Sequence, residues 1–164
     1  MDLLPDDIVE LARRVVEENR AAGRTVALAE SCTGGLVCAA LTEIAGSSAV
    51  LDRGFVTYSN EAKRELLGVP EEILDAFGAV SVATAWAMAQ GALNRSGADV
   101  AVAISGIAGP DGGSEHRPVG TVVFARAIRG RSEDVDAEER HLENTGRAGV
   151  RRQAALVALE LLLP

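Results

Sequence analysis

Residues 25–41, TVALAESCTGGLVCAAL, restrict the possible folds of this chain more than any other stretch. The stretch begins with small apolar residues, typical of a buried strand, and from Leu36 onward its apolar residues recur at helical spacing. Between the two lies the polar corner 30–35, whose two glycines let the backbone turn tightly and let a ligand approach closely. A helix that starts directly after a strand exposes unpaired amides and the positive end of its dipole. The stretch therefore predicts a strand–turn–helix unit whose corner favours negative charge.

Ser31, in the middle of this corner, has two interpretations. Its hydroxyl would be a nucleophile beside backbone amides that stabilise an oxyanion. Alternatively, Ser31 or Thr33 only caps the following helix, as serine and threonine commonly do. The stretch alone does not decide between these two roles.

The remaining sequence alternates helical and strand patterns. Apolar periodicity and capping residues predict helices at 5–22, 59–68, 70–77, 81–95 and 147–163, with the helix after the corner ending at Gly46. Strands are expected at 49–59, 99–105, 119–128 and 134–143, the last two joined as a hairpin. This order predicts one α/β domain over residues 1–164, in which helices cover both faces of a mixed sheet.

Polar corners follow three of the predicted strands, at 31–35, 58–63 and 105–109. Ligands of open α/β sheets bind at the carboxyl ends of the strands. We therefore expect these three corners to converge on one site.

Charge and composition exclude several classes of function. The formal net charge of −8 and the pI near 4.8 argue against general binding to nucleic acid or to anionic membranes. The N-terminus lacks a signal-peptide pattern, no apolar run is long enough to span a bilayer, and Cys32 and Cys38 are badly placed for a disulfide. These features predict a cytoplasmic protein, and the small-residue helix faces suggest a homo-oligomer.

A serine nucleophile needs a base, and Lys63 is the best candidate. Neither His116, in a loop, nor His141, on a predicted edge strand, has a convincing acidic orienter nearby in the sequence, which argues against a Ser-His-Asp triad. Lys63 lies at the start of a predicted helix, where partial burial would disfavour its cation, lower its pKa and leave a neutral amine. Tyr58 would relay the proton or orient the amine. The alternatives are a solvated Lys63 and Cys32 as the nucleophile.

Two further patterns concern metals and anions. No His, Cys or acidic residues show a familiar metal-ligand spacing such as HExxH or CxxC. Arg147, Arg151 and Arg152 crowd the start of the last predicted helix, where cations are electrostatically disfavoured. Such a cluster fits a solvated face, but an anion held against it, such as a phosphate, explains it better.

Several motifs together resemble the C-terminal domain of the competence-damage-inducible protein CinA, a family of nicotinamide-nucleotide amidases. They are AESCTGG at 29–35, VTYSNEAKRELLGV at 56–69, AVSVATAWAMAQG at 79–91, SGIAGPDGG at 105–113 and PVGTV at 118–122. The resemblance implies a three-layer α/β/α sandwich around a mixed sheet of about five strands, one of them antiparallel. It also implies hydrolysis of nicotinamide mononucleotide to nicotinate mononucleotide and ammonia, with no metal or organic cofactor.

The resemblance implies Ser-Lys chemistry on Ser31 and Lys63, with Tyr58 assisting. The amides of Thr33, Gly34 and Gly35 are expected to stabilise the oxyanion. The 5′-phosphate is expected at the corner 105–109 and at the arginines of the last helix. The residues expected to contact substrate are Glu30, Thr33, Gly34, Gly35, Asn60, Ser105, Gly106, Ala108, Gly109, Arg147 and Arg151.

The chain departs from the family pattern in two places. Ser105 stands where the family commonly has threonine, and HLENTGRAGVR at 141–151 lacks a common aromatic residue and a common acid. Larger members also carry an N-terminal domain resembling molybdopterin-binding proteins, which we do not expect here. A non-catalytic nucleotide-binding module and an amidase for a different amide remain alternatives, and ammonia release from nicotinamide mononucleotide separates them.

Overall fold

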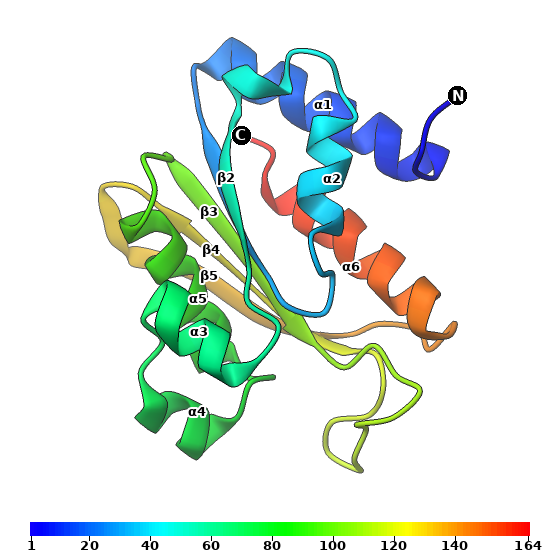
Figure 1. Cartoon of the computed structure of the whole chain (residues 1–164), viewed down its shortest axis with the longest axis vertical. Helices are drawn as coiled ribbons and strands as arrows, with labels where there is room; N and C mark the ends of the chain where they lie inside the picture. The colour runs from blue at the N-terminus through cyan, green and yellow to red at the C-terminus, as the bar shows by residue number, and fades with distance from the viewer.

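A five-stranded mixed sheet forms the centre of the computed structural model, which describes the backbone of residues 1–164 and all side chains except those of 132–135. Across the sheet the order is β2 (Leu51–Val56), β1 (Val26–Glu30), β3 (Val100–Gly106), β4 (Thr121–Ile128) and β5 (Arg131–His141) (Figure 1). β1 pairs in parallel with β2 and β3, whereas β4 pairs antiparallel with β3 and β5. β4 alone therefore runs against the other strands, which confirms the predicted mixed sheet.

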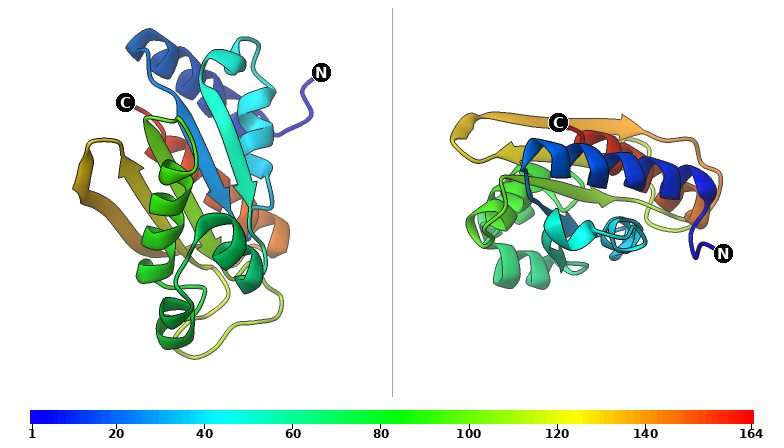
Figure 2. Two further views of the ribbon diagram at one scale, coloured as in Figure 1. Left: turned by 60° about the vertical axis from the view of Figure 1, so that its left-hand side comes forward. Right: turned by 90° about the horizontal axis from the view of Figure 1, so that it is seen from above.

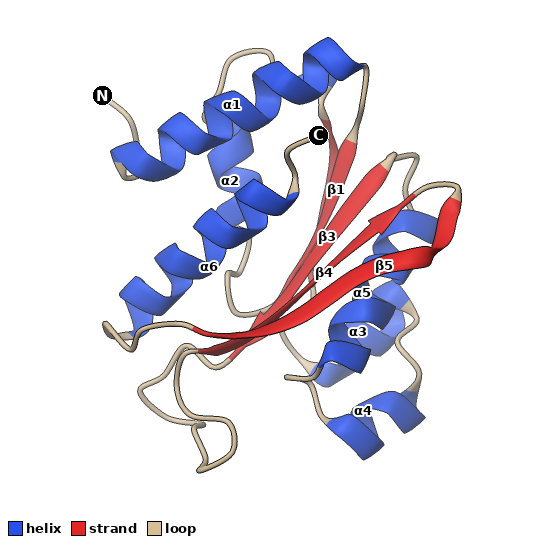
Figure 3. Ribbon diagram, turned by 180° about the vertical axis from the view of Figure 1, so that it is seen from behind, coloured by secondary structure: helices blue, strands red, loops and turns tan.

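Helices cover both faces of the sheet and complete the expected three layers (Figure 3). The helices α1 (Asp6–Ala22), α2 (Leu36–Thr42) and α6 (Arg147–Leu161) lie on one face. On the other lie α3 (Asn60–Leu67), α4 (Glu71–Phe77) and α5 (Val82–Asn94), which come forward in the left view of Figure 2. Because its two faces are covered, β1 is buried at all five positions, which explains its continuous apolar sequence.

Small residues bring α5 close to the sheet and α3 close to α5. The core on this face is mostly alanine, contributed by α5 and by alternate residues of β1, β3 and β4. At Gly91 of α5, an added Cβ would lie 2.1 Å from the carbonyl oxygen of Leu67 at the end of α3. Only glycine permits this approach. The close packing fixes α3, the helix that carries Lys63, against α5.

Most predicted elements are confirmed to within one or two residues, and three boundaries differ. β2 is shorter than expected, because a 3₁₀ turn occupies Ser47–Ala49 and residues 57–59 leave the sheet to enter α3. There the Ser59 hydroxyl caps α3 by accepting a hydrogen bond from the Ala62 amide at 3.0 Å. α2 ends at Thr42, before the expected Gly46. β5 begins at Arg131 and not at residue 134, whose side chain lies outside the described residues.

Two expectations about composition agree with the fold. Cys32 and Cys38 are both free, as their spacing predicted. Within the described residues, no helix has the length and hydrophobicity that crossing a membrane requires.

Candidate active site

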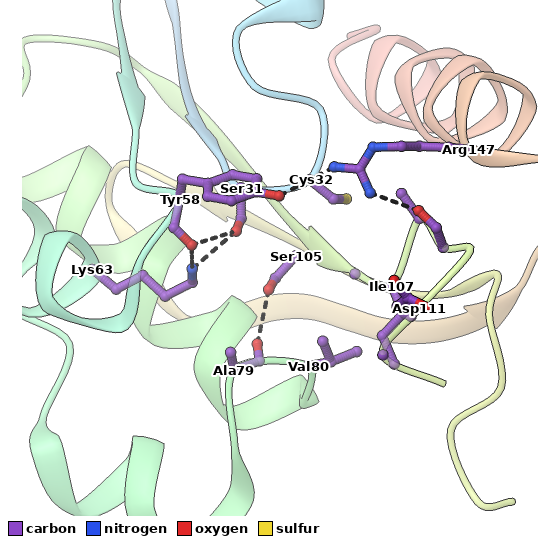
Figure 4. A pocket seen from close by; sticks show the side chains of 14 residues that line it. Ser31, Cys32, Tyr58, Lys63, Ala79, Val80, Ser105, Ile107, Asp111 and Arg147 are labelled. Atoms are coloured by element: carbon purple, nitrogen blue, oxygen red, sulfur yellow. Dashed lines mark hydrogen bonds between the residues drawn. The ribbon is translucent and has the colours of Figure 1, made fainter. Parts of the chain in front are cut away.

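The three predicted polar corners meet at the carboxyl ends of β1, β2 and β3 around a cavity of about 290 Å³ (Figure 4). The convergence follows from the parallel pairing of these strands, which places their ends at one edge of the sheet. The cavity is lined by Ser31, Cys32, Tyr58, Lys63, Ala79, Val80, Ser105, Gly106, Ile107, Ala108, Gly109, Asp111, Gly112 and Arg147.

The corner after β1 is a tight double turn that presents Ser31. The Ser31 amide still donates to the β3 carbonyl of Ile104 at 2.9 Å, so the serine is anchored to the sheet. The Gly34 amide then donates to the Ser31 carbonyl at 3.0 Å and closes a β-turn. Gly34 and Gly35 have φ angles of 58° and 101°, a left-handed conformation that glycine adopts without strain. The two glycines therefore shape the nucleophile turn.

A buried carboxylate, that of Glu30, caps α2. Its two oxygens accept hydrogen bonds from the Val37 and Cys38 amides at 3.0 and 3.1 Å. The side chains of Ser31 and Thr33 make no cap, so the cap interpretation of the corner is wrong. The protein supplies the negative charge that the helix start favours, and Glu30 does not line the cavity.

Lys63, on α3, is a second buried charged residue at this edge of the sheet, with an exposed fraction of 1%. Its Nζ lies 2.9 Å from Ser31 Oγ, 2.8 Å from the Thr57 carbonyl oxygen and 3.1 Å from that of Tyr58 (Figure 4). Among the described side chains, no carboxylate forms an ion pair with it. Burial lowers the pKa of Lys63 from 10.5 to about 8.

These contacts suit a neutral amine that accepts a proton from the serine. A neutral lysine has two N–H donors and one lone pair, and the carbonyls of Thr57 and Tyr58 provide acceptors for both donors. In that neutral form the lone pair would face the third neighbour, Ser31 Oγ, at the distance a general base requires. The Ser31 hydroxyl also lies 3.4 Å from the Tyr58 carbonyl oxygen, to which it donates when the lysine is an ammonium. The predicted Ser31–Lys63 hydrogen bond is therefore present.

Cys32 lines the cavity beside Ser31, but its thiol is a poor nucleophile. Burial raises the pKa of Cys32 to about 11, so the thiol stays protonated at neutral pH. The backbone of Cys32, and not its thiol, is the part suited to a role in catalysis. Its backbone amide occupies the position that completes oxyanion holes after a nucleophilic serine. This amide donates to no carbonyl oxygen of the described residues and contacts only the thiol of its own residue.

The model of the CinA C-terminal domain matches residues 8–164. The chain belongs to this family. It is 53% identical over 156 residues to the nicotinamide-nucleotide amidohydrolase PncC of Escherichia coli K12, covering 95% of the chain and 93% of that protein. It is also 58% identical over 146 residues to a putative competence-damage inducible protein of Symbiobacterium thermophilum, covering 85% of the chain but only 34% of that longer protein.

Solved structures support the same assignment. The competence/damage inducible protein CihA of Agrobacterium tumefaciens superposes with a TM-score of 0.94 at 54% identity, covering 99% of this chain and 97% of that one. A CinA-superfamily protein of Klebsiella pneumoniae superposes with a TM-score of 0.88 at 41% identity, covering 94% of each chain. Fold and sequence therefore agree on the family.

In this CinA-family site, the backbone carbonyl and the phenol ring of Tyr58 make different contacts. Its carbonyl orients the lysine amine, whereas its exposed phenol reaches across the cavity mouth, and the phenol oxygen accepts a hydrogen bond from Arg147 at 3.2 Å. The geometry therefore favours the second of the two predicted roles, orientation of the amine, and assigns it to the carbonyl.

Arg147, Arg151 and Arg152 of α6 separate into three environments. Arg147 lies at the cavity, where it also donates to the Gly109 carbonyl at 2.6 Å, beside a helix start that has no side-chain cap. Arg151 donates to carbonyls of the nucleophile turn, and Arg152 forms an ion pair with Asp7 on α1. Of the three predicted anion ligands, the structure places only Arg147 at the cavity.

The other predicted contact residues divide into two groups. Ser105, Gly106, Ala108 and Gly109 line the cavity, and the Ser105 hydroxyl donates to the Ala79 carbonyl at 2.8 Å. The residues that do not line it are Glu30, Thr33, Gly34, Gly35, Asn60 and Arg151. The Gly34 amide is also already paired with the Ser31 carbonyl.

Sequence reasoning missed part of the cavity wall. Ala79 and Val80, between α4 and α5, face the serine from the opposite side, and Ile107 and Asp111 also line the cavity (Figure 4). Their only signal was the presence of 79–91 and 105–113 among the family motifs. Neither histidine lines the cavity, and no three His, Cys, Asp or Glu side chains gather as metal ligands within the described residues.

Proposed function

We propose that this chain hydrolyses the carboxamide of nicotinamide mononucleotide to nicotinate mononucleotide and ammonia. The observation that carries the proposal is a buried lysine amine, free of any described carboxylate, at 2.9 Å from a serine hydroxyl that faces a cavity. The name and the 53% identity of the Escherichia coli relative support the choice of substrate.

Acylation begins with transfer of the Ser31 proton to the Lys63 lone pair while Oγ attacks the carboxamide carbon. The developing oxyanion is stabilised by the Cys32 amide, which donates to no carbonyl oxygen of the described residues and takes the place of the Thr33–Gly35 amides expected from the sequence. The Lys63 ammonium then returns its proton to the amide nitrogen, the C–N bond breaks, and ammonia leaves. The product of this half-reaction is an ester of Ser31.

Deacylation repeats the same steps with water as the nucleophile. Neutral Lys63 removes a proton from water, the resulting hydroxide attacks the ester carbon, and the lysine ammonium protonates Ser31 Oγ as it departs. Because Lys63 is alternately base and acid, a pKa near neutrality suits both steps. The enzyme returns to its starting state with the carboxylate product in the cavity.

The cavity suggests one orientation for the nucleotide. Its apolar wall, formed by Val80 and Ile107, suits the pyridine ring, with the carboxamide directed to Ser31. The phosphate then lies at the mouth, near Arg147 and the uncapped start of α6. In a chain of net charge −8, these groups supply the local positive potential that a phosphorylated substrate needs.

Activity should increase with pH. Burial lowers the pKa of Lys63 to about 8, and below that pH the amine is protonated and has no lone pair for the serine proton. The value of kcat/KM on the nucleotide should therefore rise by about tenfold per pH unit below the pKa and level off above it. Initial rates from pH 6 to 10 test this. A flat or falling profile through pH 8 would show that neutral Lys63 is not required.

Arg147→Ala should weaken the binding of nicotinamide mononucleotide but not the binding of nicotinamide riboside, which lacks the phosphate. A charge-assisted hydrogen bond contributes about 1.5–3 kcal/mol, or roughly ten- to hundredfold in binding. KM for the nucleotide should rise by about that factor, with little change for nicotinamide riboside. Arg152→Ala is the matched control, because Arg152 lies on the same helix but pairs with Asp7. Equal losses on both substrates would place phosphate recognition elsewhere.

The direct test of the function is to incubate the purified chain with nicotinamide mononucleotide and to measure both products. Stoichiometric ammonia and nicotinate mononucleotide support the proposal. Tight binding without ammonia would indicate a nucleotide-binding module. Ammonia from another carboxamide, but not from this nucleotide, would indicate an amidase of different specificity.

A further inference from the structure

Arg151 lies outside the cavity, yet its guanidinium contacts the turn that holds the nucleophile. Its Nε donates to the Cys32 carbonyl oxygen at 3.1 Å and its Nη2 to the Thr33 carbonyl oxygen at 3.2 Å. The two contacts join α6 to the corner after β1 across more than a hundred residues of sequence. A Cβ added at Gly34 would lie 3.7 Å from the same Nη2, so the guanidinium also lies against the glycine turn.

The location of Arg151 needs an explanation, because cations are disfavoured near helix N-termini. Arg151 is half-buried and lies within the second turn of α6. The carbonyls of Cys32 and Thr33 provide the compensating negative charge, and the planar fork of a guanidinium suits two neighbouring acceptors. The arginine is therefore explained by the turn, without a bound phosphate.

The contacts fix two successive peptide planes of the turn. The Thr33 carbonyl also accepts from the Leu36 amide, but the Cys32 carbonyl receives no other hydrogen bond from the described residues. Among the described residues, Arg151 is therefore the only hydrogen-bond donor to the Cys32 carbonyl. The two planes are the Cys32–Thr33 and Thr33–Gly34 planes. The plane before them carries the Ser31 carbonyl and the Cys32 amide, and the Gly34 amide ties it to the same turn. Arg151 therefore holds the turn that carries Ser31 Oγ and the Cys32 amide. The Glu30 carboxylate, before the turn, accepts hydrogen bonds from the first amides of α2 and so holds the start of that helix.

We infer that Arg151 is a positioning residue: through the Cys32 and Thr33 carbonyls it holds the turn so that Ser31 Oγ meets the Lys63 amine and the Cys32 amide faces the oxyanion. The inference rests on the proposed function, since it concerns the same serine. It assigns to Arg151 an effect on chemistry and none on phosphate binding. Misplacement of a reacting group by about 1 Å can reduce a rate by roughly a hundredfold.

The experiment compares Arg151→Gln, Arg151→Lys and the control Arg152→Gln with the parent chain. Two readouts are measured: steady-state kinetics on nicotinamide mononucleotide and its riboside, and the rate at which a small sulfonyl fluoride labels Ser31, followed by peptide mass. The sulfonyl fluoride carries no phosphate and reports the reactivity of the serine itself. Thermal unfolding confirms that each variant is folded.

For Arg151→Gln we expect kcat and the labelling rate to fall together by about ten- to hundredfold, with KM for the nucleotide within about twofold of the parent value. Arg151→Lys should recover part of both rates, because an ammonium can still donate to one carbonyl. Arg152→Gln should match the parent. If Arg151→Gln does not fold, the same two readouts on Arg151→Lys decide the question.

Two results would overturn the inference while leaving the proposed function intact. One is parent-like kcat and labelling in the Arg151 variants. The other is a rise in KM confined to the phosphorylated substrate, which would make Arg151 a phosphate ligand. A parent chain that neither releases ammonia from the nucleotide nor is labelled at Ser31 would overturn the proposed function, and this inference with it.

Discussion

Ser31→Ala should abolish ammonia release from nicotinamide mononucleotide while leaving the nucleotide bound. The change removes the attacking oxygen and nothing else from the cavity wall, and neither Lys63 nor Tyr58 loses its other contacts. Loss of a nucleophile that acts together with its base typically lowers kcat by about 10⁴-fold or more. The measurement is kcat from ammonia release, with binding followed separately by calorimetry.

Cys32→Ala is the matched control for this variant. Its thiol lies at the same cavity beside Ser31, but burial raises the pKa of Cys32 to about 11 and keeps it protonated. The proposed role of Cys32 is carried by its backbone amide, which alanine retains, so most activity should remain. An inactive Cys32→Ala together with an active Ser31→Ala would reverse the assignment of the nucleophile.

Lys63→Arg should be nearly inactive, although it keeps a positive charge at the site. A guanidinium does not deprotonate at accessible pH, so it has no lone pair for the Ser31 proton. Loss of general acid–base catalysis costs about 10²–10⁴-fold, and more when the nucleophile depends on the base. Lys63→Met, which keeps a long side chain without an amine, should be equally impaired. Both variants are compared with the parent by kcat after thermal unfolding has shown that they fold.

Comparison of Lys63→Arg with Lys63→Met also shows whether Lys63 acts as a base or only as a fixed positive charge. If the amine served only to attract an anionic transition state, arginine would retain activity and methionine would lose it. That outcome would contradict the proposed mechanism even if Ser31→Ala were inactive. If a Lys63 variant keeps measurable activity, its rate should no longer rise near pH 8. Loss of that rise would show that it depends on the Lys63 amine.

The sequence allowed much of the fold to be predicted because its local signals agree with one another. Continuous small apolar runs marked β1 and β3 as strands buried on both faces, and the glycines at 34 and 35 marked the sharp turn after β1. Ser59 and Ser81 marked the starts of α3 and α5, where both side chains do cap. The end of β2 was harder, because residues 57–59 keep a strand-like composition after leaving the sheet.

The site was predictable only where chemistry and strand ends coincide. Ser31, Lys63 and the corner 105–109 each follow a strand, so their convergence could be inferred from the order of the elements. The hydrogen-bond partners of Glu30 and Arg151 could not be inferred from the sequence, because they depend on three-dimensional contacts that charge patterns do not encode. A carboxylate that caps its own neighbouring helix and an arginine that binds a distant turn both look like ligand-binding residues in the sequence.

In the proposed mechanism Ser31 carries the acyl group of the substrate, and an activated ester of nicotinate mononucleotide makes this intermediate observable. With a phenyl ester, the leaving group departs without needing protonation, so acylation becomes faster than deacylation and the acyl-enzyme accumulates. Acid quenching during turnover, followed by peptide mass analysis, should find the nicotinate mononucleotide acyl group on Ser31, with a burst of phenol equal to the enzyme concentration. An acyl group on Cys32 or on any other side chain, with Ser31 unmodified, would contradict the account.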